Sequence, residues 1–195
     1  MSDDAAEEIM CATYRALCTH GYADLTMQDI ADESTKSKAA LHYHYDSKHD
    51  LLCAFLEYLY GEFVERTGDI DAADPRERLL AFVDAVLEKP DDGEGLETAL
   101  LEIRAQAPYD PGFRDRLTNF ETYLVAEFTD ILEAGVDDGT FAADIDPEDT
   151  ARFLVTVVTG AATERVTVGR SVECTQRMLR EYVGTHLLAQ AEATP

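Results

Sequence analysis

Apolar residues recur along this chain at the spacing of an α-helix, and no stretch shows the sustained alternation of a β-strand. After residue 50 they repeat every three or four positions, which places them on one side of each helix. The four stripes contain Leu52, Phe55, Leu56, Leu59 and Phe63; Leu79, Phe82, Val83, Val86 and Leu87; Leu96, Leu100 and Ile103; and Phe113, Leu117, Phe120, Leu124, Phe128 and Ile131. The pattern predicts an all-α protein.

Three helices are predicted to begin at an Asp-Pro pair: Asp74-Pro75, Asp110-Pro111 and Asp146-Pro147. Asp caps the helix, and Pro fits the first helical position because its missing N–H needs no partner there. The pairs are evenly spaced, as in a helical repeat, but the sequences after them share little beyond the cap. We therefore expect a bundle without internal repeats.

The segment before residue 50 predicts two short helices followed by the start of a longer one. Thr26 caps the first, and Ser37 caps the second, which should run from Lys38 to Tyr43. Ser47 caps the third, which should continue to about Thr67. Two short helices across a tight turn are typical of a helix-turn-helix motif.

Charge singles out the same segment. The chain has a formal net charge of −24, yet three of its four lysines, Lys36, Lys38 and Lys48, and three of its five histidines lie between Leu25 and Leu52. A cluster of positive charge in so acidic a chain indicates a negatively charged binding partner, and the polyphosphate backbone of nucleic acid is the usual one.

This stretch resembles the DNA-binding domain of TetR-like (TetR/AcrR) transcriptional regulators. The matching residues are Gly21-Tyr22, Thr26, Asp29-Ile30-Ala31, Ser37, Leu41, Tyr45, Ser47-Lys48 and Leu51-Leu52. The resemblance is specific over residues 5 to 60, and later stretches such as LLEIRAQAPYDPGFR look like the ligand-binding halves of some members. It implies an N-terminal three-helix helix-turn-helix domain over residues 3–63, joined by a long helix to a helical ligand-binding and dimerisation domain over residues 64–195.

The turn of the motif departs from the family pattern. Thr35 stands where the family usually has Gly. Because a β-branched residue resists positive φ, we expect the turn either to have a different geometry or to be strained.

Family position and physics place the DNA contacts in and around the second helix of the motif. A recognition helix presents its N-terminal end to the major groove, where Lys38 can donate to a guanine edge or to a phosphate and Ala39 offers only methyl contact. Thr26 and Ser37 would serve equally well as caps alone. The expected DNA-binding residues are Thr26, Gln28, Ser37, Lys38, Ala39, Ala40, His42, Tyr43, His44 and Lys48.

The resemblance also implies a ligand cavity in the second domain. Its candidate wall is a set of aromatic residues with two polar exceptions: Phe55, Tyr58, Phe82, Phe120, Tyr123, Arg104 and Gln106. The aromatic residues would serve equally well as ordinary core. Arg104 lies in an apolar sequence, so we expect it to be half-buried, either holding a ligand carboxylate or phosphate or pairing with an acid such as Glu102.

The last two predicted helices, residues 147–168 and 172–191, carry more apolar surface than a terminal hairpin needs. In the resembled family these helices form a four-helix dimer interface. Its expected members here are Phe153, Leu154, Val157, Val158, Ala161, Met178, Tyr182, Val183 and Leu187. The predicted homodimer would place two recognition helices about one DNA turn apart and so bind a palindromic operator.

Acidic residues are spread along the whole chain, which is typical of a protein adapted to a cytoplasm rich in salt, as in a salt-in halophile. At about 1 M salt the Debye length is near 3 Å, so counterion release cannot be the main source of DNA affinity. Direct hydrogen bonds, base-edge fit and apolar contacts must then contribute more.

Other functional classes find little support in the sequence. The longest weakly polar run, FLVTVVTGAA, is too short to span a bilayer, so we expect a cytoplasmic protein with no membrane partner. The chain holds no HExxH, GxSxG, phosphate-loop or dinucleotide motif, which argues against an enzyme. Its four cysteines lack a CxxC spacing, and we expect buried thiols without a metal or cofactor.

We therefore predict a DNA-binding transcriptional regulator, a repressor that a small-molecule effector of unknown identity releases from its double-stranded DNA operator. Two alternatives stay open. One is a helical protein-interaction module that has lost DNA binding, which Thr35, Ala39 and the negative charge would fit. The other is a thiol- or metal-based sensor, and its candidate residues are Cys11, Cys18 and Cys53.

Overall fold

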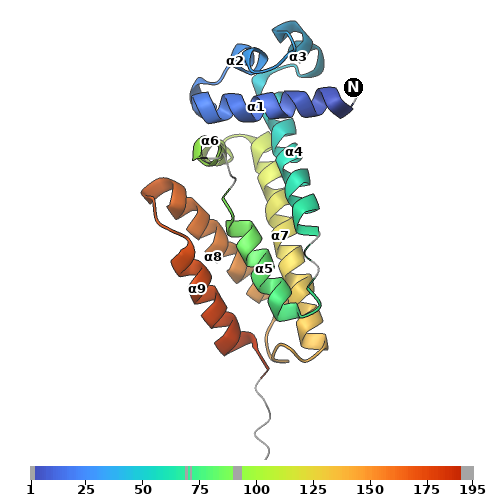
Figure 1. The fold of residues 1–195 in the computed structure, drawn as a ribbon, viewed down its shortest axis with the longest axis vertical. Coiled ribbons are helices and arrows are strands. Elements are labelled where there is room, and N and C mark those ends of the chain that lie inside the picture. The colour runs from blue at the N-terminus through green and yellow to red at the C-terminus, as the bar shows by residue number, and fades with distance from the viewer. Residues whose placement is uncertain (1–2, 69, 71, 90–93, 190–195) are drawn as a thin grey trace, which may run out of the picture. The chain divides into compact units, whose positions relative to one another are not determined.

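Helices make up the regular structure of this computed structural model, which describes residues 3–68, 70, 72–89 and 94–189 (Figure 1). In chain order they are α1 (Asp3–Asp24), α2 (Met27–Asp32), α3 (Lys38–His44), α4 (Lys48–Gly68), α5 (Pro75–Leu87), α6 (Glu94–Gln106), α7 (Pro111–Asp137), α8 (Pro147–Val168), α9 (Glu173–Tyr182) and the π-helical turn η1 (Val183–Leu187). The β pairing within these ranges is one isolated bridge between Phe141 and Leu188. The predicted all-α fold is confirmed.

The helix caps lie where the sequence predicts them. Thr26 accepts hydrogen bonds from the backbone N–H groups of Gln28 and Asp29, and the Asp29 carboxylate accepts from the Thr26 N–H, which completes a capping box. Ser37 accepts from the Ala40 N–H at 3.2 Å. A backbone N–H of the first turn also donates to each of Asp74, Asp110 and Asp146. Short-range sequence signals therefore fix the beginnings of these helices.

The chain packs as two compact units. Unit 1 contains the described residues of Met1–Val64 and Lys89–Asn119, and unit 2 contains those of Glu65–Glu88 and Phe120–Pro195. The predicted boundary between residues 63 and 64 falls next to the change of unit along α4. Lys89 and residues 94–119, which the prediction places in the second domain, pack with the N-terminal helices in unit 1. The division into functional domains stays a prediction.

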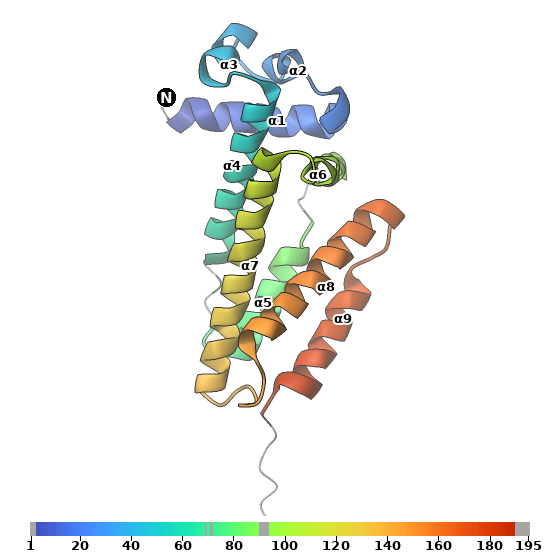
Figure 2. The same ribbon diagram turned by 180° about the vertical axis from the view of Figure 1, so that it is seen from behind.

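Unit 1 is built around α1, with α2 and α3 on one side of it and α6 on the other (Figures 1 and 2). Its core includes Ile9, Ala16, Leu17, Ile30, Leu41, Leu51, Leu52, Phe55, Ile103 and Phe113. Helix α6 meets α1 at Gly95, where a Cβ would lie 2.2 Å from the carbonyl oxygen of Cys18. The backbones of α1 and α6 thus approach as closely as glycine permits, and α6 forms one packed body with the helix-turn-helix.

Unit 2 contains α5, the C-terminal part of α7, and the antiparallel hairpin of α8 and α9 (Figure 2). The rings of Phe82 and Phe128 meet edge to face, with centroids 4.8 Å apart, in its core. The predicted helix over residues 172–191 is shorter than expected, because the α-helix ends at Tyr182 and η1 follows it. Residues 190 and 191 lie outside the described ranges.

Candidate DNA-binding surface

Helix α3 is held to unit 1 by one buried side chain and exposes most of the others. Leu41 is fully buried, whereas Lys38, Ala39, His42, Tyr43 and His44 are exposed. The exposed fraction of Tyr43 is 84%, and its ring packs edge to face on the ring of His44. The outer face of this short helix is therefore exposed to solvent over nearly its whole length.

The N-termini of α2 and α3 carry exposed hydroxyl groups that already act as caps. The Thr26 hydroxyl donates to Asp29 Oδ2 at 2.7 Å, and the Gln28 amide donates to Asp32 Oδ1 at 2.8 Å. Ser37 caps α3. The predicted capping roles of Thr26 and Ser37 are confirmed, while DNA contacts by Thr26, Gln28 and Ser37 stay predictions.

The cluster of positive charge is partly neutralised within unit 1. Lys48 Nζ donates to the carbonyl oxygens of Tyr22 at 3.0 Å and Leu25 at 2.9 Å, and it lies 4.9 Å from the centre of the Tyr22 ring. Lys36 Nζ lies 3.0 Å from a carboxylate oxygen of Glu8. Lys48 therefore ties the corner between α1 and α2 to α4 through two of its three N–H donors. Of these three lysines of unit 1, Lys38 is exposed, whereas Lys36 and Lys48 are half-buried.

The turn between α2 and α3 has a different geometry from the expected glycine turn and is not strained. Throughout the described ranges, positive φ occurs only at Gly21, Gly139 and Gly169, so Thr35 adopts an ordinary conformation. The Lys36 N–H donates to the Ser34 hydroxyl at 2.9 Å. Of the two expected outcomes, the different geometry is the one observed.

Two family models match the chain. One, described as "Bacterial regulatory proteins, tetR family", matches residues 9–55, which include α2 and α3. The other, described as "BetI-type transcriptional repressor, C-terminal", matches residues 75–188. The chain belongs to the TetR family.

Named relatives agree with this assignment. The HTH-type transcriptional repressor AcnR of Corynebacterium glutamicum is 26% identical over 93% of this chain and 92% of its own length. The HTH-type transcriptional repressor KstR2 of Rhodococcus jostii is 33% identical over 69% of this chain and 66% of its own. The crystal structure of a TetR transcription regulator from Haloarcula marismortui is 46% identical, covers 94% of this chain and 98% of its own, and has a TM-score of 0.87.

This TetR-family protein is a DNA-binding transcriptional regulator, and the relatives named above are repressors or regulators with no catalytic family among them. Ligand-responsive regulation is typical of the family. None of its described helices combines the length and hydropathy needed to cross a bilayer. The family resemblance read from the sequence is confirmed.

A histidine that the sequence did not single out links two helix starts in unit 1. His49, near the start of α4, places Nε2 3.0 Å from Asp110 Oδ1, and Asp110 also caps α7 through the Phe113 N–H at 3.1 Å. The His49 ring lies 4.9 Å from the Phe113 ring, and Nδ1 lies 3.5 Å from Asp50. The beginnings of α4 and α7 are thus tied together by a titratable pair.

This pair leads us to expect that the stability of unit 1 depends on pH. The hydrogen bond to Asp110 is the largest cause that raises the pKa of His49 above its ordinary value. A group with a raised folded pKa contributes stability that is complete below the unfolded pKa and is lost as pH rises through the folded pKa. We expect the wild type to lose more unfolding free energy than His49→Gln between about pH 6 and pH 9, measured by urea denaturation at fixed salt. His42→Gln is the control, and equal losses in wild type and His49→Gln would contradict the assignment.

The predicted ligand-cavity residues divide between the two units. Phe55, Tyr58, Arg104 and Gln106 belong to unit 1, whereas Phe82, Phe120 and Tyr123 belong to unit 2. Phe55 and Phe82 are buried in their own cores. Arg104 is exposed, so the expectation of a half-buried arginine is wrong: it falls one residue beyond Ile103, which takes the buried side of α6. The cavity itself stays a prediction.

Helices α8 and α9 use part of the predicted dimer face for their own core. Five of the predicted interface residues are buried within unit 2: Leu154, Val158, Ala161, Val183 and Leu187. Their place in a dimer interface stays a prediction. Phe153 and Met178 are 46% and 52% exposed, and Val157 and Tyr182 are half-buried. The apolar surface that α8 and α9 expose in the single chain is therefore narrower than the apolar pattern of the sequence suggests.

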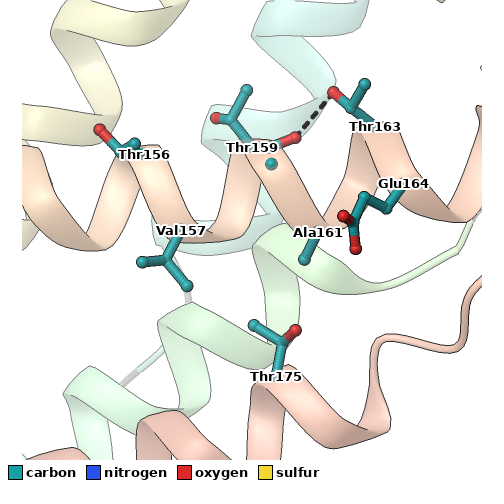
Figure 3. A pocket seen from close by; sticks show the side chains of 8 residues that line it. Thr156, Val157, Thr159, Ala161, Thr163, Glu164 and Thr175 are labelled. Atoms are coloured by element: carbon teal, nitrogen blue, oxygen red, sulfur yellow. Dashed lines mark hydrogen bonds between the residues drawn. The ribbon is translucent and has the colours of Figure 1, made fainter.

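An open hollow of about 440 Å³ adjoins this surface (Figure 3). It is lined by Thr156, Val157, Thr159, Gly160, Ala161, Thr163, Glu164 and Thr175. Val157 and Ala161 of α8 point toward Thr175 of α9 (Figure 3). The Thr163 hydroxyl donates to the Thr159 carbonyl oxygen at 2.8 Å, so this hydroxyl is hydrogen-bonded within α8 itself.

The cysteines do not follow the predicted burial. Cys53 is buried, and burial raises the pKa of its thiol, but Cys11 and Cys174 are exposed and Cys18 is half-buried. Position 11 lies off the face of α1 that buries Ile9, Ala12 and Ala16. The prediction of buried thiols is therefore wrong for Cys11 and Cys174. No cluster of three metal-binding side chains occurs in the part of the chain that the structure describes.

Proposed function

We propose that this protein is a cytoplasmic repressor that binds a palindromic operator as a homodimer and leaves it when a small-molecule effector binds. The observation that carries the proposal is the outer face of α3, where Lys38, Ala39, His42 and Tyr43 are exposed while Leu41 anchors the helix. Residues at the N-terminal end of such a helix contact base edges in the major groove. Membership of the TetR family supports the same role.

Lys38 and Ala39 are the proposed base readers. Lys38 donates to a guanine edge or to a phosphate, and Ala39 places a methyl group where it can meet thymine. His42, Tyr43 and His44 lie toward the other end of α3 and contact phosphates. The free N–H of Lys48 and the exposed N-termini of α2 and α3, marked by Thr26 and Ser37, hold the flanking phosphates.

We further propose that binding takes place at high salt. Acidic residues give the chain a net charge of −24, Lys36 is paired internally, and a relative 46% identical comes from the halophilic Haloarcula marismortui. Long-range attraction to phosphates is then weak, because salt screens it and because the chain has few unpaired positive charges. Hydrogen bonds and close apolar contacts from α3 supply most of the affinity.

The dimer is proposed to form through the exposed apolar residues of α8 and α9. Phe153 and Tyr182 place their rings 5.3 Å apart and, with Met178, form an apolar patch. At Gly160 an added Cβ would meet no atom within 4 Å, so a partner helix has room to approach α8 there. Two copies related by a two-fold axis would present two α3 helices to one operator.

The effector is proposed to bind among the predicted aromatic wall residues of the C-terminal helices, of which Phe82, Phe120 and Tyr123 lie in unit 2. Release requires that the effector bind the DNA-free arrangement more tightly than the DNA-bound one. A coupling free energy of about 1–3 kcal/mol is typical of such systems. Its magnitude follows from operator affinity measured with and without a candidate ligand.

The α3 assignment is tested by operator binding at matched salt. Lys38→Ala and His44→Ala should each weaken binding to a duplex from the protein's own promoter region, by about tenfold for a base contact. A lost phosphate contact should also reduce the slope of log K against log salt by about 1. Fluorescence anisotropy from about 0.2 to 2 M salt gives both quantities.

Lys89→Ala is the matched control, because it removes the one lysine outside the motif. Unchanged operator affinity in Lys38→Ala and His44→Ala, with helical content retained, would remove α3 from the DNA contacts. That result would favour the protein-interaction alternative.

A further inference from the structure

Glu8 of α1 binds the turn between α2 and α3 with both carboxylate oxygens. Oε1 accepts hydrogen bonds from the Thr35 backbone N–H at 2.9 Å and from the Thr35 hydroxyl. Oε2 lies 3.0 Å from Lys36 Nζ. These contacts lower the pKa of Glu8 to about 2, with the Thr35 hydroxyl as the largest cause, so the carboxylate is charged at any working pH.

A second charged pair fastens the beginning of the same turn. Arg15 Nη2 donates to the Glu33 carbonyl oxygen at 2.7 Å, and Arg15 Nε lies 3.3 Å from the Glu33 carboxylate. Glu8 and Arg15 are seven residues apart and therefore share one face of α1. Glu8 of α1 pairs with Lys36, and Arg15 of α1 pairs with Glu33. Because the two pairs have opposite polarity, the charges also set the direction in which the turn crosses α1.

Helix α3 depends on this fastening because little else fixes it. It has seven residues, and Leu41 is its one fully buried side chain. A single apolar anchor allows the helix to rotate and tilt, whereas base readout requires side chains to be placed within about 0.5 Å. The turn enters α3 directly through Ser37, so holding Thr35 and Lys36 also holds the N-terminal end of the recognition helix.

We propose that Glu8 is a positioning residue for operator recognition, which clamps the turn and α3 against α1 and at the same time withholds Lys36 from the DNA. The proposal rests on DNA binding by α3. Thr35 supplies two of the three donors that contact Glu8, and Lys36 supplies the third, which gives this unusual turn residue a purpose. The ion pair keeps one of the few lysines from adding sequence-independent attraction to phosphates.

Glu8→Ala should therefore move specific and non-specific binding in opposite directions. Specific operator affinity should fall about tenfold, because the turn loses three charge-assisted contacts. Affinity for a random-sequence duplex should rise, and its salt slope should steepen by about 1, because Lys36 becomes available for a phosphate. A variant that only loosened the fold would lose both kinds of binding together.

Two variants and one control separate the parts of the clamp. Glu8→Gln keeps an acceptor for Thr35 and should raise non-specific affinity with a smaller loss at the operator. Thr35→Val removes the hydroxyl alone and should weaken operator binding without changing the salt slope. Glu7→Ala removes the same charge one residue earlier, on an exposed position of α1, and is the control for net charge.

The measurement is the ratio of operator to random-duplex affinity by anisotropy competition, with thermal melting as a check on folding. An unchanged ratio in Glu8→Ala, or an equal change in Glu7→Ala, would overturn the proposal. If Lys38→Ala weakens operator binding while Glu8→Ala leaves the ratio unchanged, the clamp fails and DNA binding by α3 stands. If neither Lys38→Ala nor Glu8→Ala affects operator binding, the assignment of α3 as the DNA-binding helix itself fails.

Discussion

The Gly95→Val protein is expected to lose about 3 kcal/mol of unfolding free energy, at the upper end of the cost of overpacking a core. The Cβ would fall 2.2 Å from the carbonyl oxygen and 2.7 Å from the Cα of Cys18. The obstacle is backbone, and it cannot rotate away as a side chain would. The first turn of α6 must therefore move off α1, which uncovers Leu96 and Ala99, both buried in the native packing.

Urea denaturation followed by circular dichroism measures this loss, and it should be compared with Gly61→Ala. Gly61 lies in the interior of α4, and an added Cβ meets no atom within 4 Å there. That control should be neutral or more stable by about 0.5–1 kcal/mol, because alanine favours a helix more than glycine does. Equal stability of Gly95→Val and wild type would mean that α6 does not approach α1 this closely.

The same variant addresses how α6 relates to the recognition helix. Because α6 and the helix-turn-helix share one core, α6 cannot shift without disturbing α1, on which the turn and α3 are fastened. We expect Gly95→Val to weaken operator binding even under conditions where most molecules stay folded. Anisotropy at a low urea concentration, far below the unfolding midpoint, separates this effect from unfolding.

Local signals in the sequence predicted most of the elements. Helix starts are marked by Thr26, Ser37 and the three Asp-Pro pairs. A capping side chain accepts from backbone N–H groups within three residues of it, so the signal is local in the sequence. The apolar stripes predicted which side of α5 and α7 is buried, since Phe82 and Phe128 fill the core of unit 2. These features depend on spacing alone.

The details of the DNA-binding surface depend on contacts between distant residues. Lys48 bonds to Leu25 and Glu8 bonds to Thr35 across 23 and 27 residues, and no periodicity reveals such pairs. A count of lysines therefore does not reveal that Lys36 is paired with Glu8. The burial of α8 also depends on distant contacts. This helix is apolar on two sides, and the sequence does not show that Leu154 is buried in the core while Phe153 is exposed.

The double variant Phe153→Asp with Met178→Asp should separate the proposed dimer into monomers and reduce operator affinity by at least about 100-fold. A dimer binds its second half-site as an intramolecular step, and this advantage of about 10²–10⁴ disappears in a monomer. Both side chains are about half exposed, while the buried Leu154 and Val158 keep unit 2 together. Light scattering after size exclusion gives the mass, and anisotropy gives the affinity.

Tyr109→Asp is the control for this variant, because it replaces another aromatic residue, 87% exposed, outside α8 and α9. A dimer that survives the double substitution would place the interface elsewhere. Salt provides an independent check. Two chains that each carry a net charge of −24 repel one another at low ionic strength, whereas apolar contact between α8 and α9 is not screened. The dissociation constant of the wild-type dimer should therefore rise as salt is removed, and an interface built on ion pairs would show the opposite trend.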